Sequence, residues 1–491
     1  MPPPDSQIPI VTSSAGQGAP QPMWLIPLVV ASALFMENMD SSVIATSLPA
    51  IAVDLGEDPV ILKLALTSYL LSLAVFIPLS GWCADRYGAR TVFQAAIAIF
   101  IVSSLGSATA SSLAELVVAR SAQGIGGAMM VPVGRLILLR AIPKSQMVNA
   151  LAWLTIPALI APVIGPPIGG YITTYYDWRW IFWINLPVGL LGIALARAFM
   201  PNVKGDEVEP LDWTGFALAG LGLSTLIFGF TVVGRDILPA GFAPAMIVAG
   251  AALIVAYVLH SRKAAHPILD LKLLKLVTFR TSIAGGGMFR IGIGAIPFLL
   301  PLMLQVGFGL DAFQTGMITF AGAFGALAMK FTAGAILRRY GFRRVLTVNA
   351  LICAAFLATY GLFSPATPHW LIAVVLLAGG FFRSLQFTSL NAVAYADVPE
   401  RLMSRATAMI AVGQQLFLSA GVALAAFVLE TTRAARGEAA LGPDDFAIAF
   451  FVIAALTGAA ALFHARLPDN AGAEISGHDD AAVRSFRWFR S

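Results

Sequence analysis

GWCADRYGAR (residues 81–90) occurs a second time in this chain, in altered form, as GAILRRYGFR (residues 334–343). Both copies carry glycine, arginine, tyrosine, glycine and arginine at the same five positions. Two further matches follow in the same order, because RSAQ (120–123) returns as RSLQ (383–386) and Pro143 returns as Pro399. The shared order predicts two homologous halves in one chain.

The composition indicates that these halves lie in a membrane. Hydrophobic residues make up 58% of the chain and charged residues 12%, and the mean hydropathy is +0.82, unlike a soluble domain. Apolar runs recur with a length of about 20 residues, which lets a helix cross roughly 30 Å of hydrocarbon. The runs lack the alternation of a barrel strand. The sequence therefore predicts an all-α polytopic membrane protein.

Fourteen apolar runs are long enough to be transmembrane helices. They are 23–45, 60–82, 91–110, 114–139, 148–173, 179–199, 212–233, 241–260, 280–304, 313–336, 345–363, 370–391, 403–430 and 446–466. Eight of them separate the two copies of the 81–90 motif, whereas two six-helix halves would need only six. We therefore expect an inserted helix pair within 211–260.

The predicted organisation is two six-helix bundles, an inserted pair and two tails. The boundaries are 1–22 for a disordered tail, 23–200 and 279–467 for the bundles, 201–278 for the linker and inserted pair, and 468–491 for the second tail. The first tail lacks Lys and Arg, so it is not a secretory signal. Most of the 31 Lys and Arg residues fall on the side of the 81–90 loop. The positive-inside rule places that side, and both termini, in the cytoplasm.

Four motifs together resemble one transporter family. They are MDSSVIATSLPAI (39–51), GWCADRYGAR (81–90), RSAQGIGGAMMVP (120–132) and GPPIGG (165–170). In these motifs the chain resembles the major facilitator superfamily, in its fourteen-span drug:proton antiporter branch of the EmrB/QacA type. The stretch FLLPLMLQVGFGLDAFQTG (298–316) is most similar to the MdtD-like members.

This resemblance implies the major facilitator fold and a function. The implied function is proton-coupled multidrug efflux from the bacterial inner membrane, in which small amphipathic compounds leave by alternating access in exchange for protons. The partners expected are the lipid bilayer, protons and a small-molecule substrate. We expect no cofactor, no nucleic acid and a monomeric transporter, with an outer-membrane efflux partner as an open alternative.

An acidic pair interrupts the first predicted span. Residues 23 to 36 are too few to cross the membrane, so the helix continues through ENMDSS (37–42). Glu37 and Asp40 share a helix face, where like charge and low dielectric both favour holding a proton. We predict Asp40 as the proton site, with Glu37 sharing that role or lining the substrate path. A charged Arg120 inside the membrane needs a polar or charged partner, and the resemblance implies that it takes part in proton coupling. The alternative is that Arg120 lies at the end of its span and contacts lipid headgroups.

The 81–90 loop predicts a conformational latch. Glycine at its start permits close helix contact, and its charged residues offer ion pairs that break when the halves move. The predicted latch residues are Gly81, Asp85, Arg86, Gly88 and Arg90. The alternative is that the arginines only anchor the loop at the cytoplasmic surface.

The fifth predicted span is rich in glycine and proline. Gly165 and Gly169 form a small-xxx-small face, and Pro166 is one of four prolines that interrupt helical hydrogen bonding, which predicts a kinked, closely packed helix. Together with Gly170 they form the motif that the resemblance implies for antiporters. Ordinary membrane packing is the alternative.

Six residues are candidates for a substrate cavity: Asn38, Gln123, Arg290, Lys330, Arg383 and Gln386. Three of them are cations in spans that contain no acid. These cations either pair with Glu37 or Asp40 across the cavity or bind an anionic group of the substrate. The second option favours an alternative function, proton-coupled export of an anionic metabolite or organic acid.

Other functional classes lack their motifs. The chain contains no Gly-Lys dipeptide, which the phosphate-binding loop of an ATP-driven pump requires. Its five histidines and two cysteines are scattered without the spacing of a metal site or of a nucleophile with its base. We therefore expect neither an enzyme nor a metal site.

Overall fold

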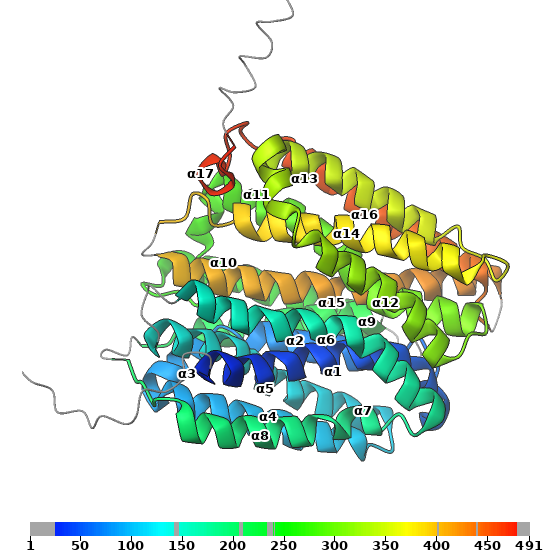
Figure 1. Cartoon of the computed structure of the whole chain (residues 1–491), viewed down its shortest axis with the longest axis horizontal. Coiled ribbons are helices and arrows are strands. Elements are labelled where there is room, and N and C mark those ends of the chain that lie inside the picture. The colour runs from blue at the N-terminus through cyan, green and yellow to red at the C-terminus, as the bar shows by residue number, and fades with distance from the viewer. Residues whose placement is uncertain are drawn as a thin grey trace, which may run out of the picture.

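The computed structural model describes residues 25–141, 147–205, 210–232, 239, 241–399, 402–437 and 440–478. Within these ranges the regular structure is helical, and the long helices run side by side (Figure 1). The predicted tail 1–22, Pro143 and the last thirteen residues (479–491) of the predicted tail 468–491 lie outside the described residues.

Helices α1 to α8 form the first part of the chain. They are α1 (Leu25–Leu55), α2 (Lys63–Phe76), α3 (Leu79–Tyr87), α4 (Ala89–Ala108), α5 (Leu113–Ala141), α6 (Met147–Tyr175), α7 (Trp180–Trp183) and α8 (Asn185–Phe199). Two helices follow at the predicted insertion, namely α9 (Trp213–Val232) and α10 (Phe242–Lys263).

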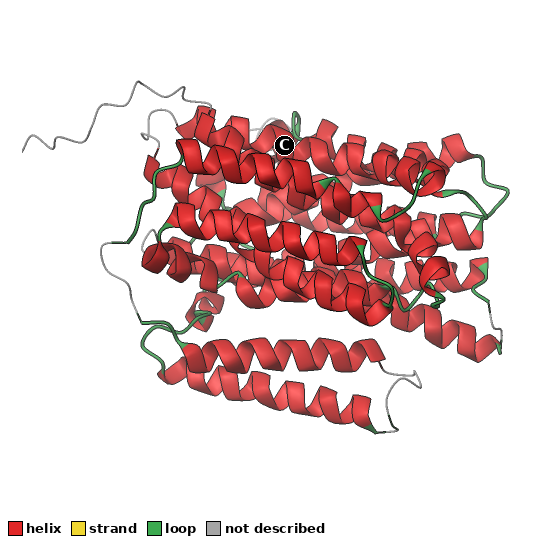
Figure 2. Cartoon of the chain, turned by 90° about the horizontal axis from the view of Figure 1, so that it is seen from below, coloured by secondary structure: helices red, strands yellow, loops and turns green. Residues whose placement is uncertain are grey.

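The last part of the chain begins with a short 3-10 helix. Its elements are η2 (Leu271–Lys275), α11 (Val277–Leu302), η3 (Met303–Gly307), α12 (Ala312–Met329), α13 (Ala333–Tyr360), α14 (His369–Val393), α15 (Met403–Arg436), α16 (Pro443–His464) and α17 (Ala473–Ser476). Helices α9 and α10 pack chiefly against each other, and Figure 2 shows such a pair standing apart from the other helices.

Twelve helices in the described chain are long and apolar enough to cross a membrane, or thirteen if the bent pair α2 and α3 counts as one span. These thirteen coincide with thirteen of the fourteen predicted runs. The remaining run, 148–173, coincides with helix α6, which is not among the thirteen. The described residues thus form an all-α fold with twelve or thirteen candidate membrane spans, and the fourteenth predicted span is not confirmed.

Two spans are broken at equivalent places. Helices α2 and α3 meet at a bend of 57°. Pro78 directly precedes α3 and has no backbone N–H, so one helical hydrogen bond is missing at this bend. Helix α12 ends at Met329, and a turn over residues 330–332 leads into α13. The second glycine of the repeated motif follows each break. Its φ is 96° at Gly88 and 69° at Gly341. Glycine adopts this conformation without steric cost, so the repeat in the sequence is also a repeat in the backbone.

The bundle has two ends, which we name after the orientation that the positive-inside rule predicts. The inner end holds the loops around residues 88 and 341, and the outer end holds residues 56–62, 308–311, 361–368, 437 and 440–442. Helix α6 packs against both α1 and α12, and α2 packs against α15. These contacts join the helices of the first part to those of the last part.

Helix α6 approaches its neighbours through the glycines of the GPPIGG motif. A β-carbon on Gly165 would lie 1.9 Å from Ser42 Oγ of α1, and one on Gly169 would lie 2.7 Å from the carbonyl oxygen of Val43. Gly170 faces α12 instead. The small-xxx-small face of Gly165 and Gly169 therefore packs against α1, and Gly170 allows α12 to approach closely. The helix runs without interruption through its four prolines.

We predict that Gly170→Ala destabilises the protein. The added β-carbon would lie 2.3 Å from the carbonyl oxygen of Ala312, so α6 and α12 must separate. Overpacking of this kind costs about 1–3 kcal/mol. The measurement is the apparent unfolding temperature of the purified protein, followed by tryptophan fluorescence.

Gly192→Ala is the matched control, because the nearest atoms to its β-carbon would be 3.5 Å away, an ordinary contact. Both changes raise helix propensity equally. A fall in unfolding temperature for Gly170→Ala alone is expected, and equal temperatures for the two variants would contradict the close contact of α6 with α12.

Candidate functional site

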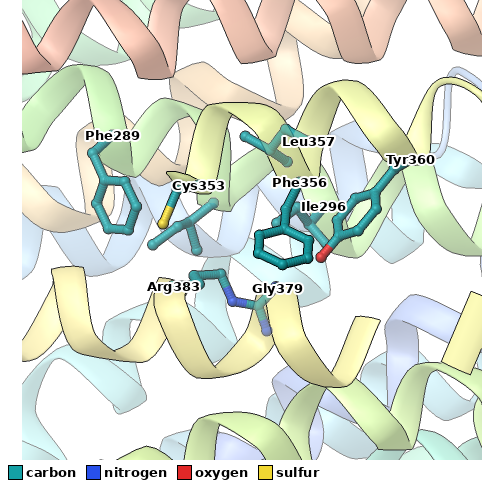
Figure 3. A pocket seen from close by; sticks show the side chains of 9 residues that line it. Phe289, Ile296, Cys353, Phe356, Leu357, Tyr360, Gly379 and Arg383 are labelled. Carbon is teal, nitrogen blue, oxygen red and sulfur yellow. The ribbon is translucent and has the colours of Figure 1, made fainter. Parts of the chain in front are cut away.

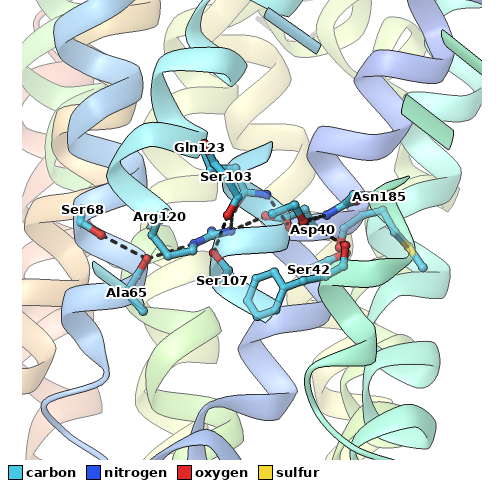
Figure 4. A network of polar contacts seen from close by, with 12 residues as sticks. Asp40, Ser42, Ala65, Ser68, Ser103, Ser107, Arg120, Gln123 and Asn185 are labelled. Atoms are coloured by element: carbon cyan, nitrogen blue, oxygen red, sulfur yellow. Dashed lines mark hydrogen bonds and ion pairs between the residues drawn. The ribbon is translucent and has the colours of Figure 1, made fainter. Parts of the chain in front are cut away.

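Asp40 lies at the centre of a buried polar network that joins three helices (Figure 4). Arg120 Nη1 of α5 donates to Asp40 Oδ2 at 2.5 Å. The other carboxylate oxygen, Oδ1, accepts hydrogen bonds from Gln123 Nε2 at 2.9 Å and from Asn185 Nδ2 at 2.8 Å. Asp40 is 3% exposed and Arg120 is fully buried. The ion pair is therefore shielded from solvent, and both carboxylate oxygens are occupied.

Arg120 is held from several sides. Its Nε donates to the carbonyl oxygen of Ala65 at 3.3 Å, and its Nη1 also donates to Gln123 Oε1 at 2.6 Å. The guanidinium carbon lies 4.4 Å from the centre of the Tyr69 ring, close enough for a cation–π contact. Arg120 thus ties α2 to the pair, and it is not exposed at a membrane surface in this structure.

Asn185 belongs to this network although no sequence motif includes it. Its Nδ2 group also donates to Ser104 Oγ at 2.9 Å, which connects α8 to α4. Asn185 is a polar residue within the apolar run 179–199. That position was the available signal, because a buried amide requires hydrogen-bonding partners.

Glu37 does not share the environment of Asp40. Its Oε2 atom is buried and has no hydrogen-bond partner among the described residues. The charged groups that act on it are Arg135 and Asp40. The two acids lie within one turn of α1, yet only Asp40 is part of the network.

A cavity of roughly 520 Å³ lies between the two sets of helices. Its walls come from α1, α6, α11, α12, α13 and α14. Three of the predicted cavity residues line it, namely Asn38, Lys330 and Arg383. The size suits a drug-sized ligand.

The other three predicted cavity residues lie elsewhere. Gln123 belongs to the Asp40 network. Gln386 is fully buried, accepts from Asn349 Nδ2 at 3.0 Å and donates to the carbonyl oxygen of Leu346 at 3.0 Å. Both glutamines hold helices together and do not face the cavity, because the sequence gives the helix but not which of its faces is turned inward.

Arg290 is also withdrawn from the cavity. Its Nη1 donates to the carbonyl oxygen of Ser282 at 3.1 Å, and its Nη2 donates to Asn391 Oδ1 at 2.9 Å. Lys330 Nζ donates to Thr388 Oγ1 at 2.7 Å. The sequence left open that these cations pair with Asp40. They do not do so in this structure, because the Asp40 carboxylate is paired with Arg120.

The 81–90 loop contacts the segment that follows α8. Arg90 Nη1 donates to the carbonyl oxygen of Met200 at 3.3 Å, and Gly205 N donates to the carbonyl oxygen of Asp85 at 3.1 Å. Arg86 lies over the ring of Trp82, at 5.4 Å from its centre. These contacts anchor the loop within the first part of the chain.

The two glycines of this loop differ. A β-carbon on Gly88 would lie 2.3 Å from Asn202 Oδ1, so the close approach and the positive φ both require glycine. At Gly81 no described atom lies within 4 Å of such a carbon. The expected close helix contact at Gly81 is therefore absent from the described part of this structure.

Polar contacts between the first and last parts of the chain lie toward the outer end. Lys63 Nζ meets Glu430 Oε1 at 2.7 Å, and Arg433 Nη1 meets Asp58 Oδ2 at 2.6 Å. Two neutral contacts add to them: Gln305 Nε2 donates to the carbonyl oxygen of Thr46 at 2.8 Å, and Phe313 N donates to Thr174 Oγ1 at 3.0 Å. These contacts join the two parts of the chain near the outer end.

The family of the chain follows from comparison with known proteins. The sequence pattern of the Major Facilitator Superfamily matches residues 30–422 and 282–483. The chain belongs to this superfamily. Superfamily members are membrane transporters of small molecules and not enzymes, and the same holds for this protein. No group of three or more potential metal ligands occurs among the described residues.

Curated relatives point to one subgroup. The chain is 35% identical over 451 residues to a protein of Cronobacter sakazakii named "Putative multidrug resistance protein MdtD", covering 90% of this chain and 94% of that one. A protein of the same name from Pectobacterium atrosepticum is 36% identical over 401 residues, covering 82% and 86%. The predicted resemblance to MdtD-like members is thereby confirmed.

Solved structures agree on the fold. An auto-inhibited POT family peptide transporter matches with a TM-score of 0.66 and 15% identity, over 91% of this chain and 98% of that chain. A mutant of the nucleoside transporter NupG matches with a TM-score of 0.64 and 14% identity, over 90% and 99%. At such identities the likeness concerns the fold alone.

We predict that Arg120→Gln destabilises the protein strongly, because it leaves the buried Asp40 carboxylate without its counter-charge. Breaking a buried pair from one side costs about 3–5 kcal/mol. The double variant Asp40→Asn with Arg120→Gln should recover part of that loss, since no unpaired charge remains. The apparent unfolding temperatures of the single and double variants provide the test.

Arg433→Gln is the control for this prediction. It breaks an ion pair with Asp58 in which both side chains are about a quarter exposed, 24% and 29%. Such pairs contribute about 0–1 kcal/mol, so a small effect is expected. Equal losses in Arg120→Gln and Arg433→Gln would show that the Asp40 pair is not buried as described.

Proposed function

We propose that this transporter exports small amphipathic compounds in exchange for protons, by alternating access between the two halves of the chain. The observation that carries the proposal is the buried ion pair of Asp40 with Arg120 beside the cavity. Asn38, Ser41 and Ser42 line the cavity, while Asp40, on the same turn of α1, points into the network on the other side. The same turn of α1 therefore carries both the proposed proton site and residues that line the proposed substrate cavity.

Proton binding would change the network at a defined atom. A proton on the Asp40 carboxylate makes it a neutral acid and removes the counter-charge of Arg120. Because an unpaired buried cation is costly, α1 and α5 then favour a different arrangement. The cavity wall on α1 moves with them, which couples the proton to the substrate.

The proton gradient can supply the energy for export. One unit of pH difference corresponds to about 1.4 kcal/mol per proton. A membrane potential of 100 mV adds about 2.3 kcal/mol for each elementary charge that crosses. Exchange of protons for substrate can thus work against a substrate gradient without ATP.

Alternating access requires the outer end to open. The contacts of Lys63 with Glu430 and of Asp58 with Arg433 join the halves there. In the proposed cycle these contacts break while the inner end closes, which makes the present arrangement the inner-facing one. The 81–90 loop is proposed to help the inner end close, as its latch residues predict.

The relatives and the sequence support the remaining parts of the proposal. The relatives' names refer to multidrug resistance, which suits a cavity with walls of apolar side chains. We propose fourteen spans, with α6 as the fourteenth, and two six-helix bundles at 23–200 and 279–467. The proposed location is the bacterial inner membrane with both termini in the cytoplasm, according to the distribution of Lys and Arg.

We predict that Asp40→Asn abolishes substrate-driven proton movement. Internal pH is measured in proteoliposomes that hold a proton gradient, while three naphthyl probes are added in turn. The probes are 2-naphthalenesulfonate, (2-naphthylmethyl)trimethylammonium and 2-naphthylmethanol, which cannot themselves carry protons across the bilayer at neutral pH. At least one should drive proton movement through the unmodified protein and none through Asp40→Asn.

Asp444→Asn is the matched control, since it removes a carboxylate whose side chain is 86% exposed and far from the network. It should leave the proton movement unchanged. Proton movement through Asp40→Asn at the unmodified rate would contradict the assignment of Asp40 as the proton site.

A further inference from the structure

The central cavity contains positive charge and no acid. Of the residues that line it, Lys330 and Arg383 are charged, and none is Asp or Glu. Asp40 is turned away into its own network, where three donors occupy its two oxygens. Glu37 is not part of the cavity wall. The cavity therefore carries two formal positive charges within the bundle.

Lys330 lies at the break between α12 and α13. Its backbone N–H bonds to the carbonyl oxygen of Leu327 in a tight turn, so the lysine sits where the helix is interrupted. Irregular backbone within a membrane bundle is tolerated where it lines a cavity, and interrupted helices often form transport sites. The Nζ group donates to the neutral Thr388 hydroxyl, and no Asp or Glu is among the described residues that line the cavity with it.

Arg383 extends from α14 toward the opposite wall formed by α13. Arg383 lines the central cavity and also a smaller pocket between α13 and α14, where Figure 3 shows its side chain near Cys353, Phe356 and Tyr360. Within the described chain its guanidinium makes neither an ion pair nor a hydrogen bond. The planar group has five N–H donors suited to a carboxylate, sulfonate or phosphate.

The buried cations Arg120, Lys63 and Arg290 have fixed partners, whereas Lys330 is exposed and Arg383 is partly buried. Arg120 pairs with Asp40, and Lys63 pairs with Glu430. Arg290 is held by a carbonyl oxygen and an amide oxygen. The two cavity cations differ because their charge is uncompensated, which is costly at membrane depth.

The rest of the cavity wall is largely apolar. Ile293, Ile296, Leu300, Leu376 and Phe387 contribute aliphatic and aromatic surface. A ligand that fits this cavity therefore needs an apolar body to cover these side chains and an anionic group to meet the two cations.

We propose that Lys330 and Arg383 form an anion-binding subsite, and that the substrate is an amphipathic organic anion. This inference rests on the proposed export function and names its substrate class. The apolar body lies against α11 and α14, and the anionic group accepts hydrogen bonds from the Arg383 guanidinium and the Lys330 ammonium. The subsite uses two of the three cations that the sequence analysis connected with an anionic cargo and leaves Arg290 in a packing role.

Binding of matched probes to the purified full-length protein tests the subsite without any gradient. Isothermal titration calorimetry compares 2-naphthalenesulfonate with (2-naphthylmethyl)trimethylammonium and 2-naphthylmethanol, which share one aromatic body and differ in charge. The sulfonate should bind most tightly. Arg383→Gln and Lys330→Gln should each weaken sulfonate binding about ten- to hundredfold, since each removes a charged hydrogen bond, and should leave 2-naphthylmethanol binding unchanged.

Two control variants separate the subsite from general charge effects. Arg280→Gln removes a positive charge from an exposed position at the start of α11, outside the cavity, and should leave sulfonate binding unchanged. Arg383→Lys keeps the charge and should retain more affinity than Arg383→Gln. If Arg383→Gln does not fold, Lys330→Gln alone tests the subsite. Lys330 is exposed and lines the cavity, so its replacement should not disturb folding.

Sulfonate binding that is unchanged in both glutamine variants would overturn the subsite. So would equal or tighter binding of the ammonium probe. The proteoliposome experiment separates this outcome from a failure of the proposed function. Sulfonate binding that depends on Arg383 but drives no proton movement would refute proton-coupled export and leave the anion-binding subsite standing.

Discussion

The burial of charged side chains inside the bundle is the constraint on which this structure depends. The buried Asp40 carboxylate accepts hydrogen bonds from Arg120, Gln123 and Asn185, and these bonds hold α1, α5 and α8 together. Such a pair contributes little net stability, because its desolvation offsets its attraction, but breaking it from one side is expensive. The network therefore fixes the arrangement of the first bundle, and a proton is a small change that can alter it.

A second constraint is the close approach of helices between the two halves. Membrane helices gain little from the hydrophobic effect when they associate, so they rely on small residues that admit a neighbour. Helix α6 uses Gly165 and Gly169 against α1 and Gly170 against α12. Helix α6 thereby links α1, which carries Asp40, to α12, which ends beside Lys330. All three helices contribute residues to the cavity wall.

The two halves use one repeated motif differently. In RSAQ the arginine pairs with Asp40, whereas in RSLQ Arg383 faces the cavity without a partner among the described residues. Both glutamines remain fully buried and hold helices together. Helix α11 carries no acid, and its own buried charge is Arg290. The same arginine is thus part of a buried ion pair in the first half and lines the cavity in the second.

The sequence by itself predicted the repeat, thirteen runs that coincide with candidate spans, and a buried acid at position 40. Hydropathy sufficed for the spans because each helix must cover the same thickness of hydrocarbon, and the positive φ at Gly88 and Gly341 follows from a motif that both halves retain. Only the tertiary structure decided which polar residues meet. Gln123, Arg290 and Gln386 lie in the predicted helices but face away from the cavity, and Asn185 joins Asp40 from a distant part of the chain. The physical reason is that a helix that is apolar on most sides carries no periodic signal for its orientation, so the faces are set by packing between helices that are remote in sequence.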